Sequence, residues 1–309
     1  MPINISTSPA IFSWRPAAWL RVTGEDAANF LQGQFTNELR GLSAASGAVY
    51  GLWLDVKGKV LADSFVLRGS GGAGGGAEFW IGSYFSPAAT IRARLESYII
   101  ADDVVIEDVT AEWAAVSWLG SGAVAALTEK CHVLRDTFPG LVFRGRRAEA
   151  ENAEWVFPVG ASDAVRALLA DLPPLDAHEM ERRRIAAGIP AVPGDVGPGD
   201  LPNEGGLEVE AISYTKGCYL GQEVMARLKS MGKVRRRLLR VNGRAGEFPP
   251  LPAPLFLGER KVGELRSIAR ESGGGFTGLA MLALMHLAPG AGLALVANGA
   301  TVVQLIDEP

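Results

Sequence analysis

The residue types best suited to chemistry lie together in residues 216–223, which read KGCYLGQE. A cysteine, Cys218, stands here close to a lysine, Lys216, and to the glycines Gly217 and Gly221. The thiolate is the nucleophilic and metal-binding form of cysteine, and a nearby cation or a helix N-terminus lowers a thiol pKa. Lys216 supplies a cation, and the following residues favour a helix. The segment therefore predicts a reactive or iron-liganding sulfur at Cys218, with Lys216 as its partner.

The neighbours of this cysteine have expected supporting roles. The two glycines are expected to allow a positive φ or the close approach of a ligand. Gln222 and Glu223 are expected to orient the loop by hydrogen bonds to backbone N–H groups, or to lie on a helix surface. Arg227 follows Glu223 by one helical turn, so its side chain is expected to point back to the segment.

An alternative interpretation makes Cys218 a small buried hydrophobic residue, as free cysteines often are. The second cysteine, Cys131, lies in an apolar stretch and is expected to be structural. Two distant cysteines without a CxxC exclude a disulfide scaffold and a zinc or iron–sulfur site built from this chain's own thiols. No resident metal is therefore predicted, and free thiols favour a reducing compartment.

The composition is that of a globular protein, with 309 residues, 48% of them hydrophobic, and a net charge of -4. This balance excludes wholesale disorder and a dedicated nucleic-acid coat. Residues 1–14 show no signal peptide, and the longest apolar run, residues 279–288, is too short for a membrane span. We expect a cytoplasmic protein without membrane contact. The densest basic cluster is expected to be a solvated face, with attraction of an anionic partner as the alternative; it comprises Lys229, Lys233, Arg235, Arg236, Arg237 and Arg240.

Helices and strands alternate before about residue 230. Strands are expected at residues 19–23, 50–67 (two, joined at Lys57-Gly58), 78–82, 104–109, 112–119 and 155–159. Helices are expected at residues 26–39, at Ser86-Pro87 with Ser86 as the N-cap, from Ser162 to Leu172, and from a capping box at Asp176 and Glu179 to Gly188. Glycine-rich residues 69–77 and the Pro/Gly-rich residues 190–202 are expected to be loops.

Short strands alone follow residue 234, with Asn298-Gly299 as a tight-turn signal between two β-rich runs. The chain is therefore expected to be an α+β protein with a small all-β domain at its C-terminal end. The expected divisions are residues 1–110, 111–232 and 233–309.

KGCYLGQE resembles the signature of the YgfZ/Iba57 family of folate-binding iron–sulfur maturation proteins, which are related to the glycine-cleavage T protein, an aminomethyltransferase. Several other stretches resemble the family in the same order: LRVTGEDAANFLQGQFTNEL, LDVKGKVLADSFVLR, RIAAGIP, LPNEGGLE and VRRRLLRV. The similarity thus covers most of the chain. The positions that match the family motif, besides the lysine and the cysteine, are Gly217, Tyr219, Gly221, Gln222, Glu223 and Arg227.

The resemblance implies a T-protein-like body of several α+β subdomains around a central folate channel, closed by a C-terminal β-barrel. It implies a tetrahydrofolate-binding accessory factor for the assembly or repair of iron–sulfur clusters, including [4Fe–4S] clusters of tRNA-modifying radical enzymes. Its partners would be iron–sulfur client proteins and assembly factors. One cysteine cannot hold a cluster alone, so a transient cluster at Cys218 would be shared with a partner.

A folate site needs an apolar or aromatic slot, polar groups at the ring edge and a cation near the acidic tail. The expected polar contacts are Glu204, Asn37, Gln34 and Asp63, and the expected wall is Trp19, with Trp14 and Trp53 as further candidates. Each also has an ordinary interpretation, because tryptophans near strands usually belong to the core and the polar residues could lie on a helix surface or in a loop.

This chain departs from the T protein at one place: where the T protein has two adjacent aspartates, this chain has Ala62-Asp63. Loss of a carboxylate removes a group that could guide proton transfer. We therefore expect folate binding without aminomethyltransferase activity. A tetrahydrofolate-dependent aminomethyltransferase remains the alternative. A tRNA-binding module on the basic cluster is a weaker one, and direct nucleic-acid binding is not expected.

Overall fold

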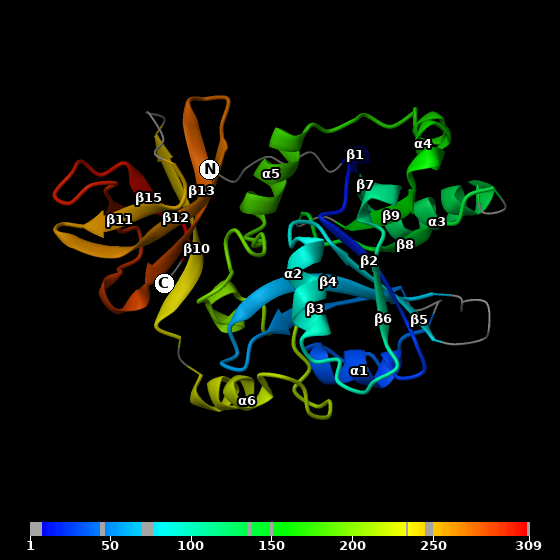
Figure 1. The fold of residues 1–309 in the computed structure, drawn as a ribbon. Coiled ribbons are helices and arrows are strands. Elements are labelled where there is room, and N and C mark those ends of the chain that lie inside the picture. Colours follow the sequence, from blue (N-terminus) through cyan, green and yellow to red (C-terminus); the bar gives the residue numbers. More distant parts are fainter. Residues whose placement is uncertain are drawn as a thin grey trace.

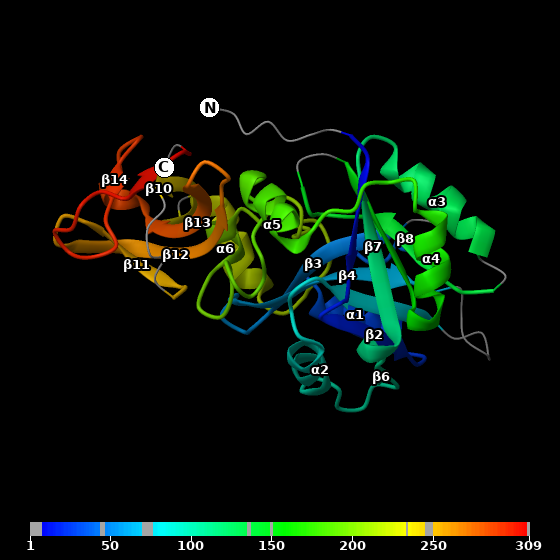
Figure 2. The ribbon, with the colours of Figure 1, turned by 90° about the horizontal axis from the view of Figure 1, so that it is seen from above.

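The computed structural model describes residues 8–43, 47–69, 77–134, 137–148, 151–232, 234–244 and 250–307. These residues form two facing sheets, each backed by helices, and a third sheet that curls into a barrel (Figures 1 and 2). Both α+β character and the C-terminal barrel agree with the expectation from the sequence. Among the described residues, no helix is at once long and apolar enough to cross a membrane.

The first sheet is antiparallel, with the strand order β3-β4-β5-β2-β6. Its strands are β2 (Ala18–Thr23), β3 (Ala48–Leu54), β4 (Val60–Arg68), β5 (Glu78–Ser83) and β6 (Val105–Asp108). Helices α1 (Ala27–Gln34) and α2 (Ala88–Glu96) cover one face. The strands and helices expected here are all present, while residues 70–76 of the expected glycine loop lie outside the described residues.

Two local expectations in this part are wrong. The helix expected over residues 26–39 ends at Gln34, because Phe35 is extended and the Thr36 hydroxyl binds distant backbone: it accepts from Leu52 N–H and donates to the Ala211 carbonyl. Ser86 does not cap α2, whose N-cap is Pro87, because the Ser86 hydroxyl is directed into the sheet.

The second sheet has the order β1-β7-β9-β8. It contains β1 (Ala10–Trp14), β7 (Trp113–Leu119), β8 (Leu141–Arg144) and β9 (Asn152–Pro158), with α3 (Ala123–Leu134) and α4 (Ser162–Leu168) packed behind it. The short 3-10 helices η1 (Thr110–Glu112) and η2 (Val159–Ala161) adjoin it. Strand β1 pairs with β7. Residues 10–14, close to the first described residue, therefore complete a sheet whose other strands come from residues 113–158.

The inner faces of the two sheets meet in a largely aromatic core. The first sheet contributes Trp19 and Phe65, and the second contributes Trp113 and Phe143. The Trp19 ring lies 5.7 Å from that of Trp113, centroid to centroid. Burial of such large rings on both sheets fixes how the sheets face each other.

Helix α5 (Ala177–Ala186) connects this body to the barrel (Figure 1). Its N-cap Asp176 accepts from Glu179 N–H at 2.7 Å, but the Glu179 carboxylate pairs with Arg182 and Arg183, so only half of the expected capping box forms. Gly188, with φ 68°, follows the helix end as expected. Ile185 packs with Ala269 and Leu279 of the barrel.

The barrel has the strand order β11-β12-β13-β10-β15-β14. Its strands are β10 (Arg236–Arg244), β11 (Ala253–Leu257), β12 (Arg260–Arg270), β13 (Gly275–Ala283), β14 (Gly292–Leu293) and β15 (Val303–Leu305), with η4 (Leu284–His286) between β13 and β14. A bridge between Phe256 and Ala294 nearly closes it. Asn298, with φ 55°, turns the chain between β14 and β15, which pair as the sequence predicts.

Candidate functional site

Cys218 is exposed, on the turn that leads into helix α6 (Gln222–Met231). The interpretation of Cys218 as a buried hydrophobic residue is therefore wrong, whereas Cys131 is buried, as expected. Helix α6 begins at Gln222, with Gly221 as its N-cap. The helix thus starts four residues after the cysteine rather than at it, and its first N–H groups do not belong to the residues next to the sulfur.

Lys216 is buried, and its Nζ donates to the carbonyl oxygens of Gln32, Phe35 and Asn37 at 2.8, 2.8 and 2.7 Å. These carbonyls lie in the last turn of α1 and just after it, where a cation is favoured by the helix dipole. Burial lowers the pKa of Lys216 to about 8, against the opposing influence of Glu38. The amine therefore fastens the motif loop to α1, and its direct action on the thiol stays a prediction.

Further contacts hold the same loop in place. Leu220 N–H donates to the Gly33 carbonyl at 3.2 Å. Gly221 has φ 85°, a backbone conformation that favours glycine, and a Cβ there would crowd the Asp55 carbonyl oxygen at 3.2 Å. Gly217 has no such constraint, since its nearest neighbour, an Arg40 nitrogen, would be 3.6 Å from a Cβ. The exposed thiol is thus carried by a turn that is anchored on both sides.

The remaining motif residues have different environments. Tyr219 is buried, with the Lys216 Nζ 5.3 Å from its ring centroid, and burial raises the pKa of its hydroxyl to about 12. Glu223 and Arg227 are exposed on α6, and Gln222 is half-buried. No ion pair between Glu223 and Arg227 occurs in the described residues. The expected orienting roles of Gln222, Glu223 and Arg227 stay predictions.

A second polar group surrounds Asp63, which is buried on β4. Its carboxylate accepts from the Tyr50 hydroxyl at 3.0 Å and from the Ser83 and Ser86 hydroxyls at 2.8 Å each. Burial raises the pKa of Asp63, although these hydrogen bonds and Arg146 act in the opposite direction. A carboxyl held in this way can exchange a proton nearer to neutral pH than an exposed aspartate does.

Arg146 completes this group from the loop after β8. Its guanidinium lies 4.5 Å from the Tyr50 ring centroid, and its Nε donates to Glu210 at 2.6 Å. We refer to Tyr50, Asp63, Ser83, Ser86 and Arg146 as the Asp63 group. Only Asp63 was singled out from the sequence. A lone carboxylate in the apolar run KVLADSFVLR signals a buried polar group, but nothing in GRRAEAE distinguishes Arg146 from a solvated loop residue.

Asn37 joins the motif loop to the Asp63 group. Its Nδ2 donates to the carbonyl oxygens of Tyr50 and Glu210 at 2.9 Å each, and its own carbonyl accepts from Lys216. Of the expected folate contacts, Asn37 and Asp63 are therefore brought together by Tyr50. A path of direct contacts runs from Lys216 through Asn37 and Tyr50 to Asp63.

The other side chains expected to contact folate form hydrogen bonds or pack in the core at other places in the fold. Gln34 accepts from Arg94 at 2.9 Å, and Trp19 is 1% exposed within the core between the sheets. Trp53 donates to the Ser64 hydroxyl, and Trp14 donates to Glu154. Their roles as folate contacts stay predictions.

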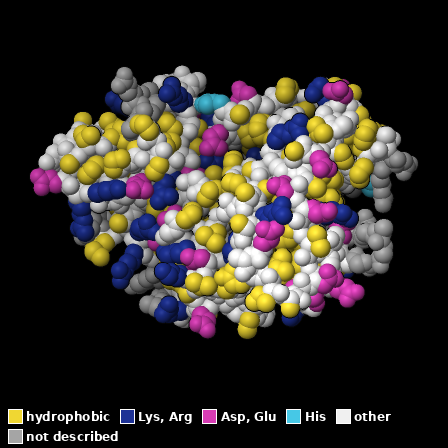
Figure 3. Space-filling view, viewed as in Figure 1, with side chains coloured by type: hydrophobic (Ala, Val, Ile, Leu, Met, Phe, Trp, Pro, Cys, Tyr) yellow, Lys and Arg dark blue, Asp and Glu magenta, His cyan; other side chains and the backbone are white. Residues whose placement is uncertain are grey.

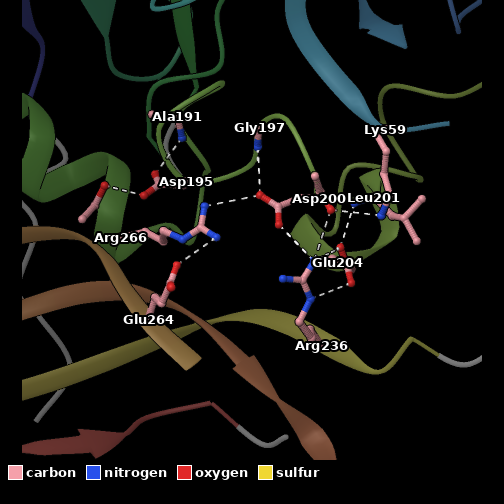
Figure 4. A network of polar contacts seen from close by, with 12 residues as sticks. Lys59, Ala191, Asp195, Gly197, Asp200, Leu201, Glu204, Arg236, Glu264 and Arg266 are labelled. Carbon is pink, nitrogen blue, oxygen red and sulfur yellow. Dashed lines mark hydrogen bonds and ion pairs between the residues drawn. The ribbon is translucent and has the colours of Figure 1, made fainter. Parts of the chain in front are cut away.

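Glu204 belongs to a network that joins the loop after α5 to the barrel (Figure 4). It lies in the 3-10 helix η3 (Pro202–Gly205), and its two carboxylate oxygens accept from Arg236 at 3.0 and 2.8 Å. Asp200 pairs with the same arginine and with Arg266. The structure thus shows Glu204 as part of the joint between body and barrel, and a folate contact through it stays a prediction.

Comparison with known proteins agrees with this architecture. Residues 235–306 match the model of the CAF17 C-terminal beta-barrel domain. The crystal structure of glycine cleavage system aminomethyltransferase T from Bartonella henselae superimposes with a TM-score of 0.73, covering 96% of this chain and 84% of that one at 16% identity. The chain therefore has the fold of that T protein, with a CAF17-type barrel at its C-terminal end.

Two curated relatives define the family. The human mitochondrial iron–sulfur cluster assembly factor IBA57 is 30% identical over 282 residues, which are 85% of this chain and 74% of IBA57. The tRNA-modifying protein YgfZ of Edwardsiella ictaluri is 30% identical over 254 residues, which are 76% of this chain and 71% of that protein. This chain belongs to the IBA57/YgfZ family.

Proposed function

We propose that this protein is an accessory factor for the assembly or repair of iron–sulfur clusters and that the thiol of Cys218 is its functional group. Relatives in the family carry the names of iron–sulfur cluster assembly factors and tRNA-modifying proteins. The observation that carries the proposal is the exposure of Cys218 at the centre of a complete KGCYLGQE motif. Its partners are iron–sulfur client proteins and assembly factors, and its location is the cytoplasm.

The cluster is treated as cargo rather than as a resident cofactor. The described residues contain no group of three or more His, Cys, Asp or Glu side chains placed to hold a metal ion. A single exposed thiolate can supply one ligand to a cluster whose other ligands come from a partner or from small thiols. The anchored turn supports this role, because a fixed sulfur loses little conformational entropy when it binds.

We further propose that the protein binds tetrahydrofolate or a derivative at the Asp63 group. The chemistry of this group fits a folate: Asp63 offers a buried carboxyl for the ring edge, Tyr50 an aromatic ring, and Arg146 a cation. A bound folate would supply a flat heteroaromatic ring with an acidic tail. The path from Tyr50 through Asn37 to Lys216 would make the motif loop sensitive to occupancy of this site.

Complementation of a deletion strain tests the role of the thiol. Cys218→Ala should fail to restore the activities of iron–sulfur enzymes and of tRNA thiolation, whereas Cys131→Ala, expressed at the same level, should restore them. Full restoration by Cys218→Ala would refute the proposal. Titration with tetrahydrofolate of the wild type and of Asp63→Asn tests the folate site, and equal affinities would refute that part.

The family's relation to the T protein raises the question of aminomethyltransferase activity. Ala62 stands where the T protein carries one of two adjacent aspartates, so a carboxylate that could guide proton transfer is missing. With purified glycine-cleavage partner proteins we expect no methylene-tetrahydrofolate formation. Turnover in that assay would favour the enzyme alternative.

A further inference from the structure

An open hollow of about 400 Å³ lies between the loop after η3, helix α6 and the start of β10. Part of its lining is apolar, since Ile212 is buried there and Leu228 is half-buried. Val209, which is 84% exposed, and the exposed Lys229 and Arg237 line it on the side of the solvent. A concave surface of this kind can take an apolar side chain of a partner protein.

Exposed cations gather at this hollow, although the whole chain carries a net charge of -4. Figure 3 shows Lys and Arg side chains where α6 leads to β10. Lys229 and Arg237 line the hollow, and the exposed Arg235 is two residues from Arg237. Among the described residues, no carboxylate forms an ion pair with any of the three. The lining contains one carboxylate, Glu208, and one of its oxygens is buried.

Other members of the basic cluster expected from the sequence are neutralised within the chain. Arg236 pairs with Glu204, and Arg240 pairs with Asp307. Lys233 lies outside the described residues. The cations that stay exposed and unpaired next to the hollow therefore favour a partner segment that carries carboxylates.

The hollow and the exposed thiol belong to one stretch of the chain. Tyr214, which lines the hollow, precedes Cys218 by four residues. Lys229 lies seven residues after Gln222, where α6 begins, which is about 10 Å along the helix axis. A standard protein interface covers about 800 Å² on each partner and is thus roughly 30 Å across. One bound protein can therefore cover both the hollow and the thiol.

We propose that this hollow is the docking point for an acidic segment of the protein that shares the cluster with Cys218. An apolar side chain of that segment enters the hollow, and carboxylates on either side of it pair with Lys229, Arg235 and Arg237. The buried apolar contact supplies affinity, while the charges at the rim steer the encounter and select against basic segments. The inference rests on the proposed function, because it names the surface that brings the partner's ligands to the thiol.

The observations favour a protein over a nucleic acid at this surface. A nucleic acid presents a continuous line of phosphates, and its binding needs an extended basic track. Here three cations lie next to a partly apolar hollow, on a chain whose net negative charge repels a long polyanion.

Photo-crosslinking in cells tests the docking surface. Ser230 is exposed on α6 next to Lys229 and does not line the hollow, so Ser230→p-benzoylphenylalanine leaves the hollow open. This variant should crosslink to an iron–sulfur protein or assembly factor, through a peptide in which Asp or Glu residues flank an apolar one. The control, Val133→p-benzoylphenylalanine, is exposed on α3 and should not form this adduct.

Adding Lys229→Glu/Arg237→Glu to the Ser230 variant should lower the yield of the adduct about tenfold or more, because attraction becomes repulsion. Absence of an adduct, attachment to RNA, or attachment to a peptide without carboxylates would each overturn the inference. A yield that the charge reversal leaves unchanged would do the same.

Complementation of the deletion strain measures the consequence for function. Lys229→Glu/Arg237→Glu should restore iron–sulfur enzyme activities to about a tenth of the wild-type level or less, while iodoacetamide still labels Cys218 at the wild-type rate. The matched control, Arg244→Glu/Arg260→Glu, reverses two exposed cations elsewhere on the barrel and should restore them fully.

Replacement of the crosslinked partner's carboxylates by lysine should recover activity with Lys229→Glu/Arg237→Glu, since the ion pairs are then reversed. Full restoration by Lys229→Glu/Arg237→Glu alone would overturn the docking surface and leave the proposed function intact. Cys218→Ala, tested in the same strain, decides the proposed function separately.

Discussion

The sulfur atoms of the two cysteines lie in opposite environments. Cys218 is exposed on the anchored turn, whereas Cys131 is 7% exposed on α3, with its Sγ 3.9 Å from the Gly140 carbonyl oxygen. Reaction of a thiol with an alkylating reagent requires access as well as ionisation. The difference in access is large enough to be measured directly.

We expect iodoacetamide to modify Cys218 alone in the native protein and both cysteines after unfolding in urea. Peptide mass spectrometry measures the two sites separately. Native Cys218→Ala protein is the control and should take up no label. Labelling of Cys131 in the native protein at the rate of Cys218 would contradict the structure.

The burial of Lys216 gives the stability a pH dependence of known sign. An unfolded lysine holds its proton up to a pKa of 10.5, whereas Lys216 in the folded protein holds it only to about 8. Between these values the unfolded state binds more protons, so the contribution of Lys216 to the free energy of unfolding rises with pH, by at most about 3 kcal/mol. The raised pKa of Tyr219, about 12, has the opposite effect above pH 10.

The variant Lys216→Met should be less stable at all pH values, because it loses three hydrogen bonds to the end of α1 and to the residues that follow it. It should also lack this rise. Urea denaturation of the wild type and the variant, at intervals between pH 7 and pH 10, gives the difference between their free energies of unfolding. The other titrating groups contribute equally to both proteins, so they do not affect this difference. A difference that stays constant over this range would show that the lysine titrates normally.

At the scale of the elements, α5 is fixed by a buried ion pair. Arg184, with 4% of its side chain exposed, donates to Asp195 at 2.6 Å and also to Glu181 and the Ile189 carbonyl. Asp195 is fully buried and holds the loop after α5 by accepting from Ala191 N–H. Removal of one partner of such a pair leaves a buried charge without compensation.

Arg184→Met should therefore destabilise the protein by about 3 kcal/mol, as measured by chemical denaturation. The control is Arg92→Met on α2, whose ion pair with Glu96 is exposed on both sides and should leave stability unchanged within error. Equal effects of the two substitutions would mean that the Arg184 pair contributes no more than a surface pair.

The elements also show what local sequence can and cannot predict. Periodic and turn signals predicted the first sheet, the helices α1, α2, α4 and α5, and the barrel, although α4 ends at Leu168 and not at Leu172. Strand β1 was missed because its partner β7 lies about one hundred residues away, and α1 was predicted too long because the groups that end it, Thr36 and Lys216, act through distant contacts.

Local sequence likewise predicts one part of the candidate site and not the other. The cysteine motif is contiguous in the sequence, so its residue types alone identified it. The Asp63 group is assembled from β3, β4, the end of β5, the turn after β5 and the loop after β8, so no single segment reveals it. The alternation of β4 could predict that Asp63 is buried, but not which side chains meet it.

At the scale of the whole molecule, the body and the barrel are joined by both apolar and ionic contacts. Met281 of β13 belongs to the same buried apolar cluster as Leu52 and Leu54 of the first sheet. Arg236 and Arg266 of the barrel pair with Asp200, and Arg236 also pairs with Glu204 (Figure 4). These contacts should couple the unfolding of the two parts.

The placement of the tryptophans allows this coupling to be measured, because all 7 lie in the body, none beyond Trp155. Tryptophan fluorescence therefore reports the body, while far-UV circular dichroism reports the body and the barrel together. In urea we expect the two transitions of the wild type to coincide.

The double variant Arg236→Met/Arg266→Met leaves the buried carboxylates of Asp200 and Glu204 without their cations. Its barrel should therefore unfold at a lower urea concentration than its body. Separate transitions in the wild type would show that the body and the barrel are not coupled. Coincident transitions in the double variant would show that the apolar contacts couple them without the ionic joint.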